Sequence, residues 1–434
     1  MSATPTPVPP PDAVRSALDV RGRELGAVIE LVPTSAVVPG ALPGMLPGSV
    51  PGALHGVSVA VKANIAVRGT AWSAGVGARS HIISSDDAPV VRALRGAGAD
   101  IVATLNMAEA ALGATTNNAF FGIARNPHDL TRTCGGSSGG SGAVVGGGLV
   151  SVALGTDTMG SIRVPAAYCG CVGFKPSNGL VPTGGVVPLS TLLDCVGPLA
   201  ADVTAVVAAL RVMAAPTAAG PWSASASHRF DWGRPVGLPD RLVVPTEVLV
   251  HELEPDVEEV FERVVDALRH HGVEIVERPL GIDLARLRRR GLVLCEAEGA
   301  AVHAELLAAD PEGFSAHVRS MFAYGGSQSA TQLAAVLQEL LDMGAKVGDV
   351  LTDADGFLTP TTPQVAFTVE APVPADQADF TAFANVAGLP AVSLPVPRKT
   401  GQLPVGIQLV GRRLADDQLA AHALAVEAML RTMS

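Results

Sequence analysis

Charged side chains are scarce in this sequence. Asp, Glu, Lys and Arg make up 16% of the 434 residues, against about 25% in an average soluble domain. The balance is acidic, with 30 Lys and Arg, 41 Asp and Glu and a net charge of −11. Without a basic stripe, a nucleic-acid-binding surface is not expected. Hydrophobic residues reach 48%, so the chain can bury a large core and does not have the composition of a disordered protein.

Cysteines and aromatic residues are also few. The five cysteines are odd in number and form no Cys-x-x-Cys pair with matching histidines, which argues against both a disulfide framework and a zinc site. With two tyrosines and three tryptophans, an aromatic cage for a cationic substrate is not expected. No charged start followed by an apolar stretch resembles a secretory signal, so we expect a soluble, cytoplasmic protein with no membrane partner.

A segment of 24 residues without charge runs from Thr133 to Thr156 and contains nine glycines. Its length would span a bilayer, but its glycine and serine content is poor for a lipid-facing helix. We therefore expect a buried helix over residues 143–154. Glycine is favoured where backbone must approach backbone or a ligand closely, so the serine-bearing turns at 135–141 and 159–161 predict a catalytic centre built from hydroxyls and main-chain donors.

Helical and strand patterns alternate along the chain, which predicts the α/β class. Residues 1–12 are expected to be a flexible tail, and 13–434 a single domain. Within it, four Pro-Gly units at 39–54 predict a surface loop of type II turns. Helices are expected at 13–30, 88–98, 252–272, 329–350 and 416–430, and strands at 57–62, 100–104, 273–276, 358–363, 391–395 and 405–410. Residues 111–121 and the variable region 215–331 are expected to line the substrate pocket.

The segment Gly135-Gly-Ser137-Ser-Gly139 matches the Gly-x-Ser-x-Gly nucleophile elbow of α/β-hydrolases. That motif requires a preceding strand and a downstream histidine base. Residues 126–134 do not have a strand pattern, and His303 and His422 lie in alanine-rich helical segments. A catalytic elbow at Ser137 is therefore disfavoured.

Lys62 is a lone cation in an apolar strand pattern, 57–67. A lysine buried there could pair with a carboxylate as a structural residue, or lose its proton and act as a base for a serine. Lys62, Ser137 and Ser161 are separated by 75 and 24 residues. They lie in or near a set of distinctive stretches: 55–62, 135–141, 155–166, 169–176, 193–198 and 385–391. In this order and spacing, the chain resembles the amidase signature family over nearly its whole length.

This resemblance implies the amidase signature fold, a central mixed β-sheet covered by helices on both faces, and an amide-hydrolysing activity. It implies that Ser161 is the nucleophile that forms an acyl-enzyme. Ser137, in a cis peptide conformation, would relay the proton to Lys62 as the base. It also implies that no metal or organic cofactor takes part.

The resemblance further assigns supporting roles in the same loop. The backbone N–H groups of Thr158, Met159, Gly160 and Ser161 would form the oxyanion hole. Asp157 and Arg163 would brace the loop as a buried ion pair, and Ser138 would shape it through backbone hydrogen bonds.

Two positions depart from the family pattern. Ala63 stands where most members have aspartate after the catalytic lysine, and Met159 replaces a small residue.

Three activities remain open from the sequence. The main prediction is a stand-alone amidohydrolase that converts a small-molecule carboxamide to a carboxylate and ammonia or an amine. A small ureido or carboxylated-amide hydrolase of the allophanate or carboxybiuret type is the second. The third is the A subunit of a glutamine-dependent amidotransferase, in which glutamine usually stands at the position of Val164. A homodimer is one assembly that the sequence allows.

Overall fold

The computed structural model describes residues 10–33, 52–214, 230–233 and 236–433. Most of the predicted tail, and the Pro-Gly repeat up to residue 51, lie outside these ranges. Residues 10–12 of the predicted tail are described, and the first helix already begins at Pro11.

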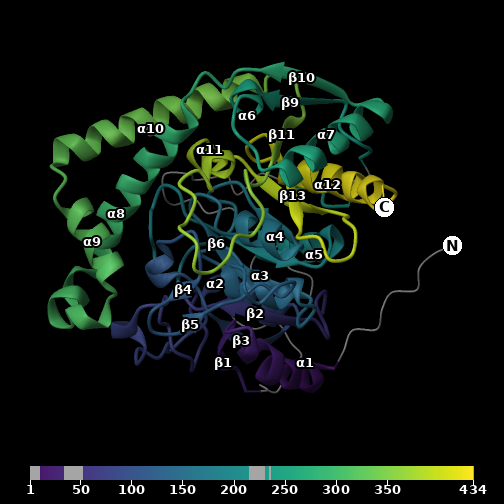
Figure 1. Cartoon of the computed structure of the whole chain (residues 1–434). Coiled ribbons are helices and arrows are strands. Elements are labelled where there is room, and N and C mark those ends of the chain that lie inside the picture. The colour runs from purple at the N-terminus through teal and green to yellow at the C-terminus, as the bar shows by residue number, and fades with distance from the viewer. Residues whose placement is uncertain (1–9, 34–51, 215–229, 234–235, 434) are drawn as a thin grey trace.

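A mixed sheet of 11 strands forms the centre of the molecule (Figure 1). Its strand order is β1-β3-β2-β6-β8-β7-β12-β13-β11-β9-β10. Two groups of three strands are parallel, β3-β2-β6 and β11-β9-β10. The five pairs between these groups, from β6-β8 to β13-β11, are antiparallel, as is the edge pair β1-β3. The strands are β1 (Val28–Leu31), β2 (Ser58–Lys62), β3 (Asp100–Leu105), β6 (Val152–Asp157), β7 (Val172–Lys175), β8 (Cys195–Ala200), β9 (Arg241–Pro245), β10 (Glu274–Arg278), β11 (Gly356–Pro360), β12 (Ala391–Val396) and β13 (Val405–Gly411). A separate hairpin pairs β4 (Asn117–Asn118) with β5 (Gly122–Ile123).

Helices cover both faces of the sheet. The core on one face includes α2 (Pro89–Gly96), α5 (Val203–Met213), α7 (Pro255–His270) and α12 (Asp416–Leu430). The cores on the other face include α1 (Pro11–Ala17), α3 (Gly139–Gly146), α4 (Arg163–Cys169), α8 (Leu284–Ala309), α10 (Ala330–Val350) and α11 (Asp379–Val386). The short α6 (Thr246–Leu249) follows β9, and α9 (Ala316–Gly326) lies between α8 and α10.

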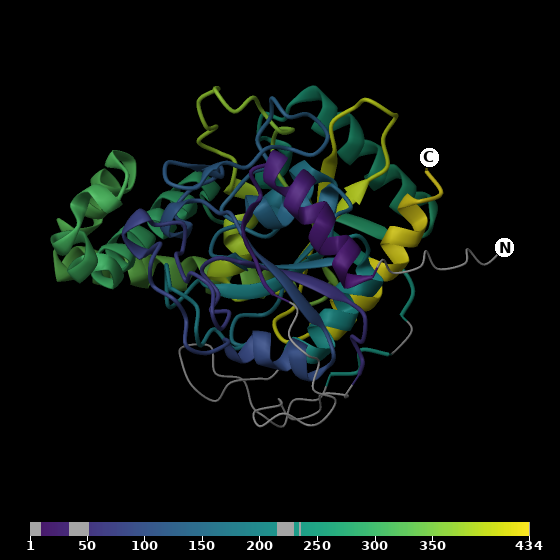
Figure 2. The same cartoon turned by 90° about the horizontal axis from the view of Figure 1, so that it is seen from below.

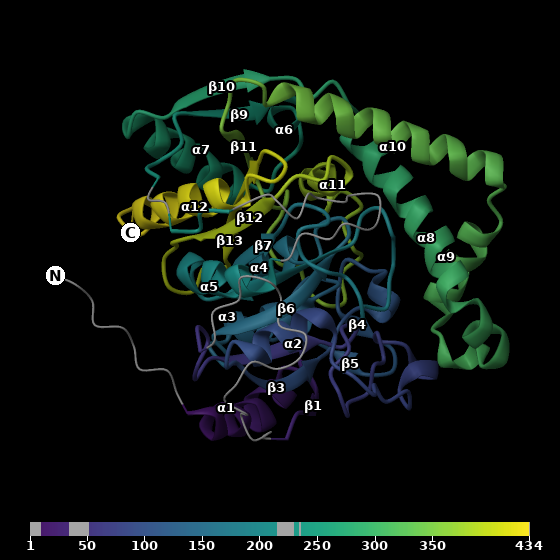
Figure 3. The ribbon, with the colours of Figure 1, turned by 180° about the vertical axis from the view of Figure 1, so that it is seen from behind.

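Figures 1 and 3 show α8, α9 and α10 projecting to one side of the sheet as an arm. Figure 2, seen from below, shows the same arm extending away from the body. Among the described residues, no helix has the length and apolar character that a membrane span requires.

The predicted α/β class, with a mixed sheet between two helical layers, is confirmed. Most predicted elements lie within a few residues of their expected bounds, and α12 begins and ends where it was expected.

Two predicted helices are wrong in part. In the segment expected to be helical over 13–30, the helix gives way at Gly26, which has φ +62°, and residues 28–31 form β1. The expected helix over 143–154 is instead the end of α3 followed by β6. All six residues of β6 are buried. A strand buried on both faces reads as a continuous apolar run, which periodicity cannot distinguish from a buried helix.

Candidate active site

Sheet geometry places Lys62 at the edge where β2 and β6 end. The two strands are adjacent and parallel, so their carboxyl ends meet at the same edge of the sheet. Side chains alternate along a strand: Val59 and Val61 belong to one core and Ala60 to the other. Lys62 therefore points to the same face as Ala60, the face that α3 covers.

Lys62 is fully buried and bonded to two hydroxyl groups. Its Nζ lies 2.7 Å from Ser137 Oγ and 2.7 Å from Thr156 Oγ1. Burial lowers the pKa of Lys62 to about 7, although the negative charges of Asp194 and Asp157 partly offset this by raising it. A substantial fraction of the amine is thus neutral near pH 7 and can accept a proton from a hydroxyl group.

Ser137 lies between the lysine and the second serine turn. The Gly136–Ser137 peptide bond is cis, and the Ser137 carbonyl accepts a hydrogen bond from Ala108 N at 3.0 Å. The neighbouring Ser138 ties the two turns together. Its Oγ donates to Thr156 O at 3.1 Å, and its backbone N donates to Ser161 O at 3.3 Å.

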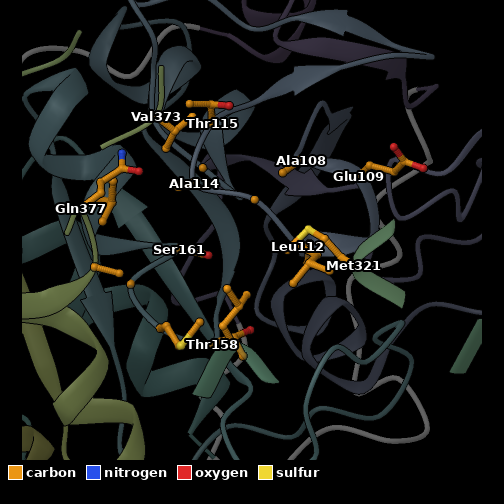
Figure 4. A pocket seen from close by; sticks show the side chains of 18 of the residues that line it. Ala108, Glu109, Leu112, Ala114, Thr115, Thr158, Ser161, Met321, Val373 and Gln377 are labelled. Carbon is orange, nitrogen blue, oxygen red and sulfur yellow. The ribbon is translucent and has the colours of Figure 1, made fainter. Parts of the chain in front are cut away.

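Ser161 lies in the turn between β6 and α4. Lys62 and Ser137 are buried, whereas Ser161 is partly exposed and lines a cavity of about 560 Å³. Figure 4 shows the Ser161 hydroxyl near the centre of this cavity, with Thr158 beside it. The cavity wall comes mainly from segments 108–119, 158–164, 288–292, 315–321 and 373–378.

A buried ion pair fixes the loop that carries Ser161. Arg163 Nε and a terminal guanidinium nitrogen lie 3.0 and 2.8 Å from the two carboxylate oxygens of Asp157. The same carboxylate accepts hydrogen bonds from Gly160 N at 2.7 Å and Ile162 N at 3.1 Å. Burial alone would raise the pKa of Asp157, but the charge and hydrogen bonds of Arg163 outweigh it and lower the pKa below its usual range.

Comparison with known proteins identifies the family. The amidase family model matches residues 40–420. The chain belongs to the amidase family. One relative is the A subunit of the glutamyl-tRNA(Gln) amidotransferase of Thermotoga maritima, 33% identical over 86% of this chain and 84% of that protein.

Solved structures of the family share the fold. A crystal structure of an amidase has a TM-score of 0.82 and 30% identity, covering 97% of this chain and 96% of that one. A protein from an inhibitor-bound vestigial complex, linked to the origins of an s-triazine catabolic enzyme, has a TM-score of 0.83 and 27% identity, covering 98% and 95%.

In this member of the amidase family, one of the four amides expected to form the oxyanion hole is already engaged. Gly160 N donates to Asp157 and so cannot point its hydrogen at a substrate oxygen in this arrangement. Gly160 instead allows close packing: its φ is +135°, and a Cβ there would lie 2.3 Å from Thr381 Oγ1. The N–H groups of Thr158, Met159 and Ser161 have no acceptor among the described residues.

The two departures from the family pattern have structural consequences. Because Ala63 carries no carboxylate, the negative charges that act on Lys62 come from Asp194 and Asp157. Met159 lines the cavity and packs against α8, where a Cβ on Gly291 would lie 2.7 Å from its sulfur. Met159 therefore connects the Ser161 loop to the arm.

The features of a hydrolase elbow are missing at Ser137. No strand lies between residues 124 and 137, all of which the structure describes. His303 packs between Phe314 and Phe322, and neither of its ring nitrogens is hydrogen-bonded to a residue that the structure describes. His422 Nδ1 contacts Gly237 O.

Several residues of the site were not predicted. They share a role in holding the Ser161 loop or Lys62 in place: Thr156, Asp194, Thr381, Asn385 and Gln408. Asn385 lies in a stretch that resembles the family, so its place in the site could have been suspected. Gln408 is contributed by β13, more than 240 residues along the chain from Arg163, and only the sheet order reveals their contact.

Proposed function

We propose that this protein is an amidohydrolase that cleaves a carboxamide through an acyl-enzyme on Ser161. The observation that carries this proposal is the 2.7 Å contact between Lys62 Nζ and Ser137 Oγ in a fully buried site beside the serine that lines the cavity. A neutral lysine next to a hydroxyl group is one way to activate a serine nucleophile.

In the first half-reaction, Ser161 Oγ attacks the amide carbon as its proton passes to Ser137, whose own proton passes to Lys62. The N–H groups of Thr158, Met159 and Ser161 are the proposed donors to the negative oxygen that forms. The proton then returns through Ser137 to the leaving nitrogen, and the C–N bond breaks. Water repeats the attack on the ester and releases the carboxylate.

The proposed catalytic domain spans residues 13–434, and its substrate pocket draws on the predicted variable region. Within 215–331, α8 supplies Arg288 and Leu292 to the cavity wall. The α9 segment, with its N-cap, supplies Ser315, His317, Val318 and Met321. Most of the lining is apolar, which favours small, neutral amides. We also propose a cytoplasmic location, because all five cysteines are free and buried, as suits a reducing compartment.

A second candidate is the A subunit of a glutamine-dependent amidotransferase. The name of the Thermotoga maritima relative favours it. Val164 argues against it, because it replaces the glutamine expected at that position, and this valine lines the cavity. This candidate predicts that glutamine is the preferred substrate and that activity depends on a partner chain.

The test is a panel of carboxamides assayed by ammonia release with the purified chain. We expect turnover of small neutral amides without any partner, and loss of turnover in Ser161→Ala to the level of the uncatalysed reaction. Glutamine hydrolysis that appears only with a co-purified partner chain would favour the second candidate. Equal ammonia release by wild type and Ser161→Ala would contradict both.

A further inference from the structure

Arg288 is tethered at one edge of the cavity. It lies in the first turns of α8, and its Nε donates to Asp379 Oδ1 at 2.5 Å. Asp379 is buried, and its second oxygen lies 3.5 Å from His251 Nε2. His251 thus contacts one oxygen of the Asp379 carboxylate, and the other oxygen binds the guanidinium group of Arg288 through a single nitrogen.

The remaining donors of Arg288 have no partner among the residues that the structure describes. An arginine side chain offers five N–H donors and is always charged. One of them is used here, while the side chain lines the same cavity as Ser161 and is 17% exposed. A ligand oxygen at this wall would satisfy donors that the protein leaves free.

Gln377 presents the complementary group two residues before Asp379. Its Nε2 donates to the Tyr168 hydroxyl at 3.2 Å, while its Oε1 accepts no hydrogen bond from the described residues. Gln377 lines the cavity, and Figure 4 shows it on the wall facing Ser161. A buried acceptor without a donor costs about 1–3 kcal/mol, which a ligand N–H group would recover.

We propose that Arg288 and Gln377 form a subsite for a second amide or ureido group on the substrate. Its carbonyl oxygen would accept from the terminal nitrogens of Arg288, and its N–H would donate to Gln377 Oε1. This deepens the proposed function and rests on it. The preferred substrate is then a compound with two amide-type groups, one cleaved at Ser161 and one held at this wall.

The charges around the subsite favour a neutral group over a carboxylate. Asp379 balances the charge of Arg288, and Asp376 lies 3.8 Å from His251 on the same side. Glu109 also lines the cavity. An anionic group would therefore meet an arginine that Asp379 already neutralises, and it would lie on the same side as the carboxylates of Glu109 and Asp376. An amide would use the free donors and acceptor without adding charge.

The test compares matched substrates. Each α,ω-diamide from malonamide to adipamide is paired with the monoamide in which a methyl group replaces one carboxamide, such as succinamide with butyramide. We expect the best diamide to exceed its partner in kcat/KM by about tenfold or more, as one or two added hydrogen bonds would give. A diamide has two equivalent amides that can be cleaved, and this alone would make its kcat/KM about 2 times that of the monoamide.

Arg288→Met and Gln377→Met should each lower the ratio of kcat/KM between diamide and matched monoamide to about 2, the value expected without the subsite. The ratio does not depend on the fraction of folded enzyme, so partial misfolding cannot mimic the result. Arg286→Met is the matched control, because Arg286 binds Glu339 on an exposed face and does not line the cavity; its ratio should equal that of wild type.

Two results would overturn the subsite: a ratio of about 2 in wild type, or an unchanged ratio in Arg288→Met. Faster turnover of the half-acid succinamate than of succinamide would show an anion site instead. Failure to hydrolyse any monoamide or diamide would reject the proposed function itself.

Discussion

Lys62→Met should lower kcat on any amide substrate by about 10²- to 10⁴-fold, the range expected when a general base is removed. Methionine has a similar length and fills the buried space, but it cannot accept the proton of Ser137. The variant should still fold, because methionine occupies the same buried space without strain. Activity within about tenfold of wild type would reject Lys62 as the base.

The dependence on pH separates the loss of a base from a merely structural effect. Because the pKa of Lys62 is about 7, kcat/KM of the wild type should rise with pH through this value and then level off.

The stability of the protein should also depend on pH through Lys62. The unfolded chain, where the lysine has its ordinary pKa of 10.5, binds more protons than the folded protein between pH 7 and 10.5. This group therefore makes stability rise with pH in that window. Lys62→Met should remove that contribution, as urea unfolding at pH 7 and pH 9 would show.

Arg163→Met should destabilise the protein by about 3–5 kcal/mol, because it leaves the Asp157 carboxylate buried without its partner. Arg163 also donates to Gln408 Oε1 and Asn385 Oδ1 at 2.7 and 2.6 Å, so three elements lose a common contact. Activity should fall as well, since the Ser161 loop is tied to Asp157.

Two comparisons identify the ion pair as the cause. The double variant Asp157→Asn/Arg163→Met should be more stable than Arg163→Met alone, because no buried charge remains. Arg21→Met breaks an exposed pair with Glu24 and should change stability by no more than about 1 kcal/mol. Urea denaturation of the wild type and the three variants measures both effects. Equal losses in Arg163→Met and Arg21→Met would contradict the account.

The sequence predicted the parts of the fold whose patterns are local. The amphipathic α7 follows from the spacing of its buried apolar residues, and β2 follows from a short run rich in β-branched residues. The division between α3 and β6 was missed because glycines in α3 serve close packing rather than a local preference. A Cβ on Gly146 would lie 2.1 Å from Cys169 O, which is a contact between separate helices that no local pattern encodes.

The site shows the same limit. Lys62, Ser137 and Ser161 were predicted from motifs, and the structure brings the first two within hydrogen-bonding distance and places the third in the cavity. The wall that Arg288 and Gln377 form depends on the packing of segments that lie far apart in the sequence. The proposed substrate preference rests on these tertiary contacts, which is why the motifs led to the family but not to a substrate.

The central claim is that Ser161, and not Ser137, is the nucleophile. A fluorophosphonate probe followed by peptide mass mapping tests it directly, because such probes label the activated serine. We predict one label per chain, on Ser161, and no label in Ser161→Ala or Lys62→Met. A label on Ser137 in the wild-type protein would contradict the account.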